Sequence, residues 1–365
     1  MKTVVICNSL MKDAAPNNFY EQFLIDNDII PISVLDIEQP NYDDVFEVDE
    51  NLVLVQISAF SCNFRDRGLM HSFKEKCQML SKERKYFYSP VGSEFTGIVV
   101  RLGRNVTSLR LGDRVMPNMA YPYKVDKTLG GVPSNYASQR ILLFSENELI
   151  RVPDMMSDEE AAAFTLSAQT AYGMVGRADI KGGENILVTS ATSNTSLAII
   201  RHLSRFNINI YAVTNRPELL KRVFNKNEIM QIFSINELEN LSPAFNFDVV
   251  FDPFIDLYIN RLFPHLSYNA KYIYCGCYIQ SRLYDIRGVQ PIYPYDIFDN
   301  CIIRNISLIG NCLGSSENLI NAINDYQERK FYVKIDSVYS GNNIKEFFYK
   351  SFLDKERIGK VVYKY

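Results

Sequence analysis

The residues best suited to chemistry form a run of small polar side chains. The run reads Ser190, Ala191, Thr192, Ser193, Asn194, Thr195 and Ser196. Hydroxyl groups can donate hydrogen bonds to phosphate oxygens, and asparagine tolerates left-handed backbone angles better than most residues. Glycines, which usually give such a turn its tight bend and its close approach to phosphate, are absent. A phosphate-binding turn and a purely structural turn both remain open from these residues alone.

The flanking sequence predicts how this turn is held. Ile186 to Val188 is a short apolar run, as expected of a strand buried on both faces. Apolar residues between Leu197 and Phe206 recur at three- and four-residue spacings, which predicts a helix. A second apolar run, Ile210 to Val213, predicts a second strand. Such a right-handed strand–helix–strand unit places the turn at a helix N-terminus, where free N–H groups favour an anion.

The end of the second strand bears on which dinucleotide would bind. Thr214, Asn215 and Arg216 follow the strand, and Glu218 is the first acidic residue after it. An acidic residue there would bind a ribose 2′-hydroxyl and repel a 2′-phosphate. Arg216 could instead pair with that phosphate bidentately, which favours NADP(H) over NAD(H). Alternatively, Arg216 and Lys221 are solvated charges of a loop and a helix.

Composition sets the broad class of the protein. The chain has 365 residues, 47% hydrophobic and 22% charged, which predicts a globular protein of two domains. A net charge of −3 gives no reason to expect nucleic acid or an anionic membrane as partner. The seven cysteines are scattered without a CxxC pair, which favours a reducing, cytoplasmic location. No apolar run approaches the roughly 20 residues of a membrane helix, and Met1 to Cys7 reads as a first strand.

Secondary-structure signals divide the chain in two. Residues 1 to about 155 are β-rich, with apolar runs at Leu52 to Ile57, Gly97 to Val100 and Arg114 to Met116. Ser157 and Glu160 form a capping-box pattern that begins a helix. The remaining predicted elements are strands at Phe247 to Asp252, Lys271 to Gly276, Ile306 to Gly310 and Gly359 to Tyr363, and an amphipathic helix from Glu317 to Phe331. We therefore predict an α/β protein with one β-rich domain, 1–156 and 313–365, and one alternating domain, 157–312.

Six segments in consistent order carry a family pattern. They are Cys62 to Asp66, Gly92 to Gly97 with Gly103, Gly112 to Val115, Ala161 to Ala163 with Thr170 to Tyr172, Phe247 to Asp252, and Ile358 to Val362. Together they resemble the medium-chain dehydrogenase/reductase superfamily, in its zinc-free quinone oxidoreductase and enoyl reductase branch. The resemblance implies a GroES-like catalytic domain, a Rossmann-type domain with a doubly wound parallel sheet, and hydride transfer from a nicotinamide cofactor in the cleft between them.

The resemblance also implies roles for single residues. Thr170 matches a position beside the nicotinamide ring, and Asn63 matches one near nicotinamide and substrate, where its amide could orient a carbonyl. Gly276 is assigned to the cofactor site together with the turn. The alternatives are a buried helix threonine at Thr170 and an ordinary turn residue at Asn63. Arg65 and Asp66 are predicted to form an ion pair that braces this turn.

Zinc-dependent members of the superfamily carry a cysteine where Asn63 stands and a histidine where Ser93 stands. The usual four-cysteine structural zinc loop is missing as well, so no zinc is predicted. Cys62, one residue from the ligand position, is interpreted as a packed cysteine. Cys275 and Cys277 are predicted to share one face of a strand in a structural role.

A zinc-free member lacks the Lewis acid that polarises a carbonyl, so the favoured reaction is NADPH-dependent reduction of an activated C=C bond. The substrate would be an enone, a quinone or an enoyl thioester, either a small molecule or a carrier-bound acyl group. One alternative is reduction of a dehydroamino acid, imine or ketone in specialised metabolism. Another is a non-catalytic binding protein on a degenerate dehydrogenase fold. A homodimer paired through Ile306 to Leu313 is also expected.

Overall fold

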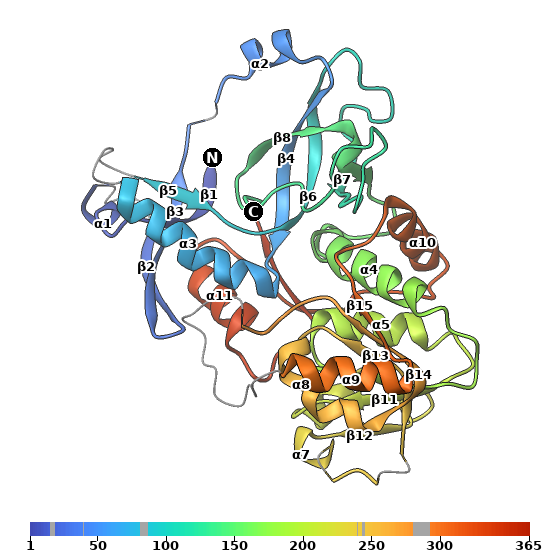
Figure 1. Cartoon of the computed structure of the whole chain (residues 1–365). Coiled ribbons are helices and arrows are strands. Elements are labelled where there is room, and N and C mark those ends of the chain that lie inside the picture. Colours follow the sequence, from blue (N-terminus) through green and yellow to red (C-terminus); the bar gives the residue numbers. More distant parts are fainter. Residues whose placement is uncertain (15–18, 39, 81–86, 239, 243–244, 280–292) are drawn as a thin grey trace. The chain divides into compact units, whose positions relative to one another are not determined.

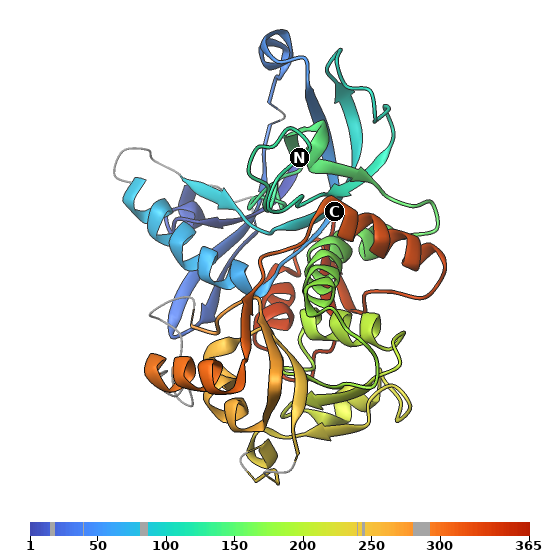
Figure 2. The same cartoon turned by 45° about the vertical axis from the view of Figure 1, so that its right-hand side comes forward.

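The computed structural model describes residues 1–14, 19–38, 40–80, 87–238, 240–242, 245–279 and 293–365. The chain forms two compact units, Met1–Leu166 with Ile335–Tyr365, and Ser167–Lys334 (Figures 1 and 2). The sequence predicted 157–312 for the second domain. The second unit instead begins within α4 (Asp158–Ala178), whose first turns belong to the first unit, and it extends to Lys334. The Ser157 capping box that begins α4 is confirmed, with Glu160 N–H donating to Ser157 Oγ at 3.2 Å.

The first unit contains two sheets. A seven-stranded sheet has the order β16-β17-β4-β6-β7-β9, with β8 paired to β4, and a four-stranded sheet has the order β2-β3-β1-β5. The strands are β1 Lys2–Cys7, β2 Phe19–Ile25, β3 Asp28–Asp36, β4 Leu52–Ser61, β5 Tyr88–Pro90, β6 Glu94–Leu102, β7 Arg114–Pro117, β8 Ile141–Ser145, β9 Leu149–Arg151, β16 Ile335–Ser340 and β17 Lys360–Lys364. Its other helices are α1 Met11–Ala14, α2 Asp43–Val48, α3 Phe64–Leu80 and α11 Ile344–Phe352. The strands predicted near residues 1, 52, 97, 114 and 360 are confirmed.

Aromatic side chains fill the core of this unit. Phe60 of β4 is fully buried and lies 5.3 Å from Phe347 of α11 and 5.4 Å from Tyr363 of β17, measured between ring centroids. Burial of large rings is a major stabilising term in a core. This packing fixes the ends of β4 and β17, and both strands contribute residues to the polar cluster described below.

The second unit is built on a six-stranded parallel sheet. Its strands are β10 Asn185–Val188, β11 Asn209–Val213, β12 Gln231–Phe233, β13 Phe247–Asp252, β14 Leu266–Tyr274 and β15 Ser307–Gly310. Its helices are α5 Asn194–Leu203, α6 Pro217–Lys221, α7 Ile235–Leu238, α8 Ile255–Leu262, α9 Pro294–Arg304 and α10 Ser316–Gln327. The sheet order β12-β11-β10-β13-β14-β15 is that of a doubly wound dinucleotide-binding fold. Right-handed crossovers that run in opposite directions from β10 and β13 place α5 and α8 on opposite faces (Figure 2).

Register confirms the predicted strand–helix–strand unit, because β10 and β11 pair in parallel from Asn185↔Asn209 to Val188↔Ala212. One interpretation is wrong. Cys275 and Cys277 do not share a strand face, because β14 ends at Tyr274 and both cysteines follow it, the first half-buried and the second exposed. Cys275 N–H donates to the Asp252 carbonyl oxygen at 3.2 Å, next to the last pair of the β13–β14 ladder, Asp252↔Tyr274, and the regular strand ends there.

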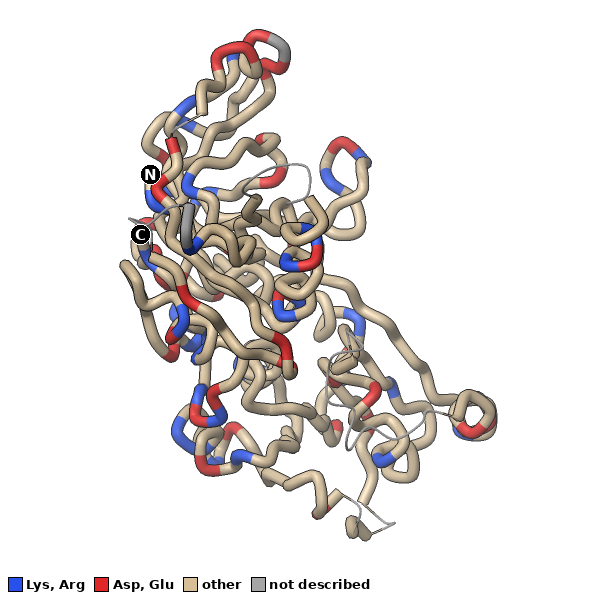
Figure 3. The backbone as a smooth tube through the Cα atoms, turned by 90° about the vertical axis from the view of Figure 1, so that its left-hand side faces the viewer, with Lys and Arg blue, Asp and Glu red and all other residues tan. Residues whose placement is uncertain are grey.

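Charged residues of both signs are interspersed along the described chain (Figure 3). None of the helices in the described ranges combines the length and the apolar character needed to cross a bilayer.

An ion-pair cluster ties the turn between β2 and β3 to α3. Asp26 Oδ2 lies 2.8 Å from Arg67 Nε and 3.0 Å from His71 Nε2, and Asp28 Oδ2 lies 3.1 Å from His71 Nδ1. Lys74 also pairs with Asp28. Arg67, His71 and Lys74 recur every three or four residues, so they share one face of the helix.

Acid should weaken this cluster. Burial opposes ionisation of Asp26 and Asp28, but hydrogen bonds from Arg67, Lys74 and His71 outweigh it and lower the pKa of both carboxyls. In acid, the folded state therefore binds fewer protons than the unfolded chain. The ion pairs stabilise the folded state fully above the unfolded-chain pKa of about 3.9, and this stabilisation is lost as the pH falls through the lowered pKa of the folded state. Urea unfolding at pH 7 and pH 3 should show that the free energy of unfolding decreases less between these pH values in Asp26→Asn than in wild type. The exposed Asp44→Asn serves as control, and an equal effect of both variants contradicts the assignment.

Candidate functional site

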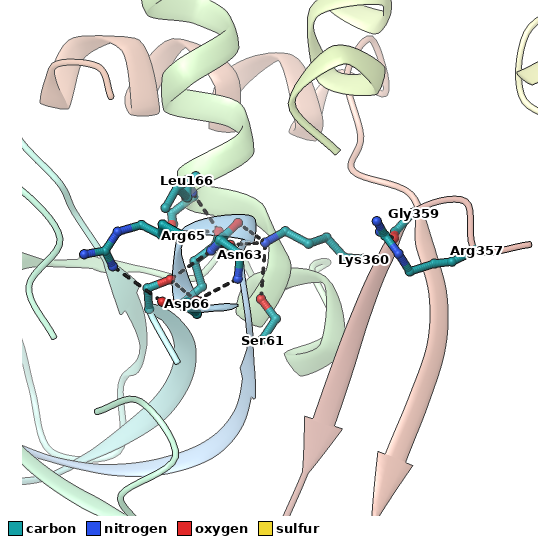
Figure 4. A network of polar contacts seen from close by, with 11 residues as sticks. Ser61, Asn63, Arg65, Asp66, Leu166, Arg357, Gly359 and Lys360 are labelled. Atoms are coloured by element: carbon teal, nitrogen blue, oxygen red, sulfur yellow. Dashed lines mark hydrogen bonds and ion pairs between the residues drawn. The ribbon is translucent and has the colours of Figure 1, made fainter. Parts of the chain in front are cut away.

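Four chain segments of the first unit meet in one buried polar cluster (Figure 4). They are the end of β4 with the start of α3, the residues that begin β6, the first half of α4, and the start of β17. The cluster consists of Ser61, Asn63, Arg65, Asp66, Ser93, Glu94, Thr165, Leu166 and Lys360. We call it the Lys360 cluster.

Lys360 holds the centre of this cluster. Its side chain and that of Glu94 are both fully buried, and they form an ion pair. The ammonium also donates to Asn63 Oδ1 at 2.6 Å and to Ser61 Oγ at 3.4 Å, so all three of its protons have partners. The other oxygen of Glu94 accepts from Leu166 N–H at 2.7 Å. A buried charge pair with its remaining donors and acceptors satisfied meets the condition under which such pairs are tolerated.

The amide of Asn63 is oriented by charged and polar neighbours on both sides. Its oxygen accepts from Lys360, while Nδ2 donates to Ser93 Oγ at 3.0 Å and to Glu94 Oε2 at 2.9 Å. Asn63 is half-buried, unlike Lys360 and Glu94. A carbonyl oxygen could therefore reach this amide only by replacing one of the two acceptors that it now has.

Asp66 forms the far end of the cluster. Burial raises the pKa of the Asp66 carboxyl, although Asn63 N–H at 2.7 Å and Ser93 Oγ at 2.6 Å donate to it. Arg65 Nη1 lies 3.5 Å from Asp66 Oδ1 and confirms the predicted ion pair. The neighbouring Cys62 is buried, and burial raises the pKa of its thiol well above the usual value, which fits a packed cysteine.

Sequence reasoning missed Lys360, Glu94 and Ser61 as members of a site. A signal for Lys360 was present, because this lysine interrupts an apolar closing strand between Gly359 and Val361. A lysine in a strand that is otherwise buried must be paired with a carboxylate. The partner could not be named, because Glu94 lies 266 positions away in the chain.

In the second unit, the small-residue turn bends without glycine. Ser190 has φ +44°, a left-handed conformation in which a non-glycine residue is uncommon, and its hydroxyl lies 3.0 Å from Tyr258 Oη. Ser193 is the N-cap of α5 and accepts from Ser196 N–H at 3.2 Å. Ser196 Oγ donates to the Thr189 carbonyl oxygen at 2.7 Å, which fixes the helix against the strand. Ala191 is fully buried, and Asn194 and Thr195 form the first turn of α5.

The predicted specificity residues lie beside this turn. Arg216 Nη2 donates to Thr192 Oγ1 at 2.6 Å, and the hydroxyls of Thr192 and Thr214 lie 3.3 Å apart. Asn215 accepts weakly from Ile235 N–H at 3.5 Å. The tertiary structure thus brings the end of β11 to the turn after β10, as the sequence predicted for a shared phosphate site.

A buried carboxylate stabilises the small-residue turn through a hydrogen bond to the residue that precedes it. Asp252, at the end of β13, accepts from Thr189 Oγ1 at 2.6 Å, Tyr272 Oη at 2.5 Å and Phe254 N–H at 2.9 Å. Burial raises the pKa of Asp252 to about 6 despite these three donors. These bonds join β10, β13 and β14 at their carboxyl ends, where ligands bind in doubly wound sheets.

Two further residues of this unit are predicted to contact a cofactor. Thr170 Oγ1 of α4 is buried and has no hydrogen-bond partner among the described residues. A buried hydroxyl without a partner is costly, which is consistent with an absent ligand group. At Gly276, a Cβ atom would lie 2.9 Å from the Pro253 carbonyl oxygen, so the packing of the protein's own backbone accounts for glycine at this position. The small-residue turn, Arg216 and the Thr170 hydroxyl fit a nicotinamide dinucleotide, and Gly276 stays a prediction.

The described residues contain no group of three or more His, Cys, Asp or Glu side chains that could hold a metal ion. Around Asn63 and Ser93 lie the carboxylates of Glu94 and Asp66, both already bound by protein donors, and the Lys360 ammonium. A lysine ammonium repels a divalent cation, so these residues do not fit zinc.

Comparison with known proteins shows which families the chain resembles. Residues 49–154 match the family "Alcohol dehydrogenase GroES-like domain". The chain is 23% identical to human quinone oxidoreductase over 236 residues, 63% of each chain. It is 33% identical to mouse quinone oxidoreductase-like protein 2 over 132 residues, which cover 36% of this chain and 34% of the relative. It is 30% identical to the squalestatin hexaketide synthase of a Phoma species over 165 residues, 45% of this chain and 6% of that protein. The matches thus span less than two thirds of these relatives.

Solved structures agree in fold over the whole chain. A crystal structure of an NAD-dependent alcohol dehydrogenase aligns with TM-score 0.73 and 19% identity, covering all of both chains. The quinone oxidoreductase of Coxiella burnetii aligns with TM-score 0.68 and 16% identity, covering 100% of this chain and 99% of the other. The sheet order, the GroES-like segment and the quinone oxidoreductase relatives agree, and together they support the medium-chain dehydrogenase/reductase superfamily, in its quinone oxidoreductase-like branch, as the family that this chain resembles.

Proposed function

We propose that this protein is a zinc-independent oxidoreductase that uses NADPH to reduce a C=C bond conjugated to a carbonyl. The observation that carries the proposal is the contact of Arg216 with Thr192, which joins a guanidinium to a turn of small hydroxyl residues at a helix N-terminus. Such a site suits a pyrophosphate and an additional 2′-phosphate. An enone, a quinone or an enoyl thioester, free or carrier-bound, is the proposed substrate class, and the names of the quinone oxidoreductase relatives support it.

The residues that would hold the cofactor are those of the turn, Ser190 to Ser196, with Thr214, Asn215 and Arg216 at the ribose phosphate and Thr170 and Gly276 toward the nicotinamide. When bound, NADPH supplies a hydride. On the substrate side, Asn63 presents an amide whose N–H groups already point at oxygen acceptors. An alkene conjugated to a carbonyl needs only such donors, because the charge that develops spreads onto the carbonyl oxygen.

A nucleotide titration tests the proposal. Purified protein is titrated with NADPH and, separately, with NADH, and reduced-nicotinamide fluorescence and thermal shift are followed. We expect tighter binding of NADPH than of NADH, followed by consumption of NADPH with cyclohexenone or naphthoquinone as probe. If neither nucleotide binds at millimolar concentration, the proposed function is wrong.

A second candidate is a non-catalytic binding protein on the same fold. One observation favours it: Ser193 and Ser190 satisfy their hydroxyls within the protein, on Ser196 and Tyr258, so the turn is stable without a phosphate. The same titration separates the two candidates. Reduction of a dehydroamino acid, imine or ketone is a further alternative, which product analysis distinguishes from C=C reduction.

We also propose a homodimer formed through the edge of the six-stranded sheet. β15 is the last strand of that sheet, and the neighbouring α9 exposes Tyr295 by 78%, Phe298 by 61% and Ile302 by 76%. Exposed apolar side chains beside a free strand edge are typical of an interface. Size-exclusion chromatography with light scattering should give a dimer for wild type and a monomer for Ile302→Asp. Ile320→Asp, on α10, should remain dimeric, and a monomeric wild type contradicts the proposal.

A further inference from the structure

We propose that Lys360 is a positioning residue of the reduction: its buried ammonium, paired with Glu94, orients the Asn63 amide that receives the substrate carbonyl. This inference rests on the proposed function and adds to it the residue that sets the orientation of the donor in the substrate site. It is carried by the contacts of the Lys360 cluster, within a single unit of the protein (Figure 4).

The contacts fix which way the amide points. Lys360 donates to Asn63 Oδ1 at 2.6 Å, and Asn63 Nδ2 lies 2.9 Å from Glu94 Oε2. A flipped amide would place its NH₂ group against the ammonium and its oxygen against the Glu94 carboxylate, so both contacts would become repulsive. Lys360 and Glu94 together therefore permit one orientation, with the amide hydrogens directed away from the lysine.

Of the two bonds made by Asn63 Nδ2, only the one to Ser93 has an uncharged acceptor. Ser93 Oγ accepts from Asn63 at 3.0 Å, but it donates its own proton to Asp66 Oδ2 at 2.6 Å. If a substrate carbonyl oxygen takes the place of Ser93 as acceptor, Ser93 keeps its bond to Asp66. The contact with Glu94 is harder to lose, because it is a hydrogen bond to an oxygen of a buried, charged carboxylate. Ser93 is thus the acceptor that a substrate would replace.

A fixed amide matters most when the substrate oxygen becomes negative. In the proposed step the alkene gains a hydride at its β-carbon and a proton from water at its α-carbon, with oxidation of NADPH to NADP⁺. Between the two events the carbonyl oxygen carries the negative charge of an enolate. The Lys360 and Glu94 charges neutralise each other, so their contribution is to hold the Asn63 donor in one orientation, and a donor that is already oriented needs no reorganisation when the charge develops.

The test separates charge from packing. Lys360→Met with Glu94→Gln removes both buried charges and keeps similar volumes, Lys360→Arg keeps the cation, and Lys364→Met removes a partly exposed lysine from the same strand. We measure kcat and KM with NADPH and cyclohexenone or naphthoquinone, and thermal unfolding of each variant. We expect kcat of the double variant to fall about 10- to 100-fold while KM stays within about twofold, as for a group acting in the transition state. Lys360→Arg should recover part of the loss.

A second readout needs no turnover. The C=O stretch of bound cyclohexenone should lie at lower frequency in the wild type than in the double variant, because the amide held in one orientation by Lys360 and Glu94 donates to the bond and polarises it. A folded double variant with wild-type kcat, or no C=O shift in the wild type, overturns the role of Lys360. Failure of the wild type to bind NADPH instead overturns the proposed function, since the nucleotide residues lie in the other unit.

Discussion

Replacement of Lys360 by methionine is expected to lower the free energy of unfolding by about 3–5 kcal/mol. The side chain is fully buried, and its removal leaves the Glu94 carboxylate without a counter-charge in the Lys360 cluster. Asn63 Oδ1 also loses its donor at 2.6 Å. An unpaired buried charge costs far more than the loss of an exposed ion pair, because no water replaces the missing partner. Urea unfolding at neutral pH, followed by circular dichroism, measures the difference.

Lys364→Met provides the matched control for this prediction. Lys364 lies on the same strand and pairs with Glu159 at 2.7 Å, but its side chain is 45% exposed. Its replacement should cost less than about 1 kcal/mol. The double variant Lys360→Met with Glu94→Gln should regain most of the stability lost in Lys360→Met. Equal destabilisation by the two single lysine variants would show that burial of the Lys360–Glu94 pair does not raise the cost of removing its lysine.

Replacement of Arg216 by alanine is expected to weaken NADPH binding by about 10- to 100-fold. A charge-assisted hydrogen bond to phosphate contributes about 1.5–3 kcal/mol, and each 1.4 kcal/mol corresponds to a factor of ten. NADH lacks the 2′-phosphate, so its affinity should change little. Fluorescence titration of wild type and variant with both nucleotides measures the selectivity directly.

The NADH arm also detects indirect damage to the turn, because Arg216 holds Thr192 at 2.6 Å. If Arg216→Ala weakens both nucleotides equally, the side chain supports the turn and does not recognise the 2′-phosphate. Lys221→Ala, at the end of α6, is the charge-matched control. Lys221 is exposed and pairs with Glu218 at 2.6 Å, so its removal should leave both affinities unchanged.

Local sequence patterns were sufficient where one element and its immediate neighbours decide the outcome. Apolar runs at 186–188 and 210–213 predicted two parallel strands, since a strand buried on both faces is apolar throughout. The proximity of Arg216 to Thr192 followed from the same logic, because carboxyl ends of adjacent parallel strands meet at one edge. The two-residue alternation of strand faces gave a wrong prediction at Cys275 and Cys277, because β14 ends at Tyr274 and the alternation does not apply beyond it.

By itself, the sequence determined the fold class, the order of the elements and the position of the small-residue turn between strand and helix, because these depend on hydrophobic period and on short-range connections. Only the tertiary structure decided the Lys360 cluster. Ser61, Glu94, Leu166 and Lys360 come from four separated segments, and an ion pair between distant residues leaves no periodic trace in a single sequence. The orientation of the Asn63 amide was decided in the same way, since the positions of its charged neighbours are set by the packing of β4, β6 and β17.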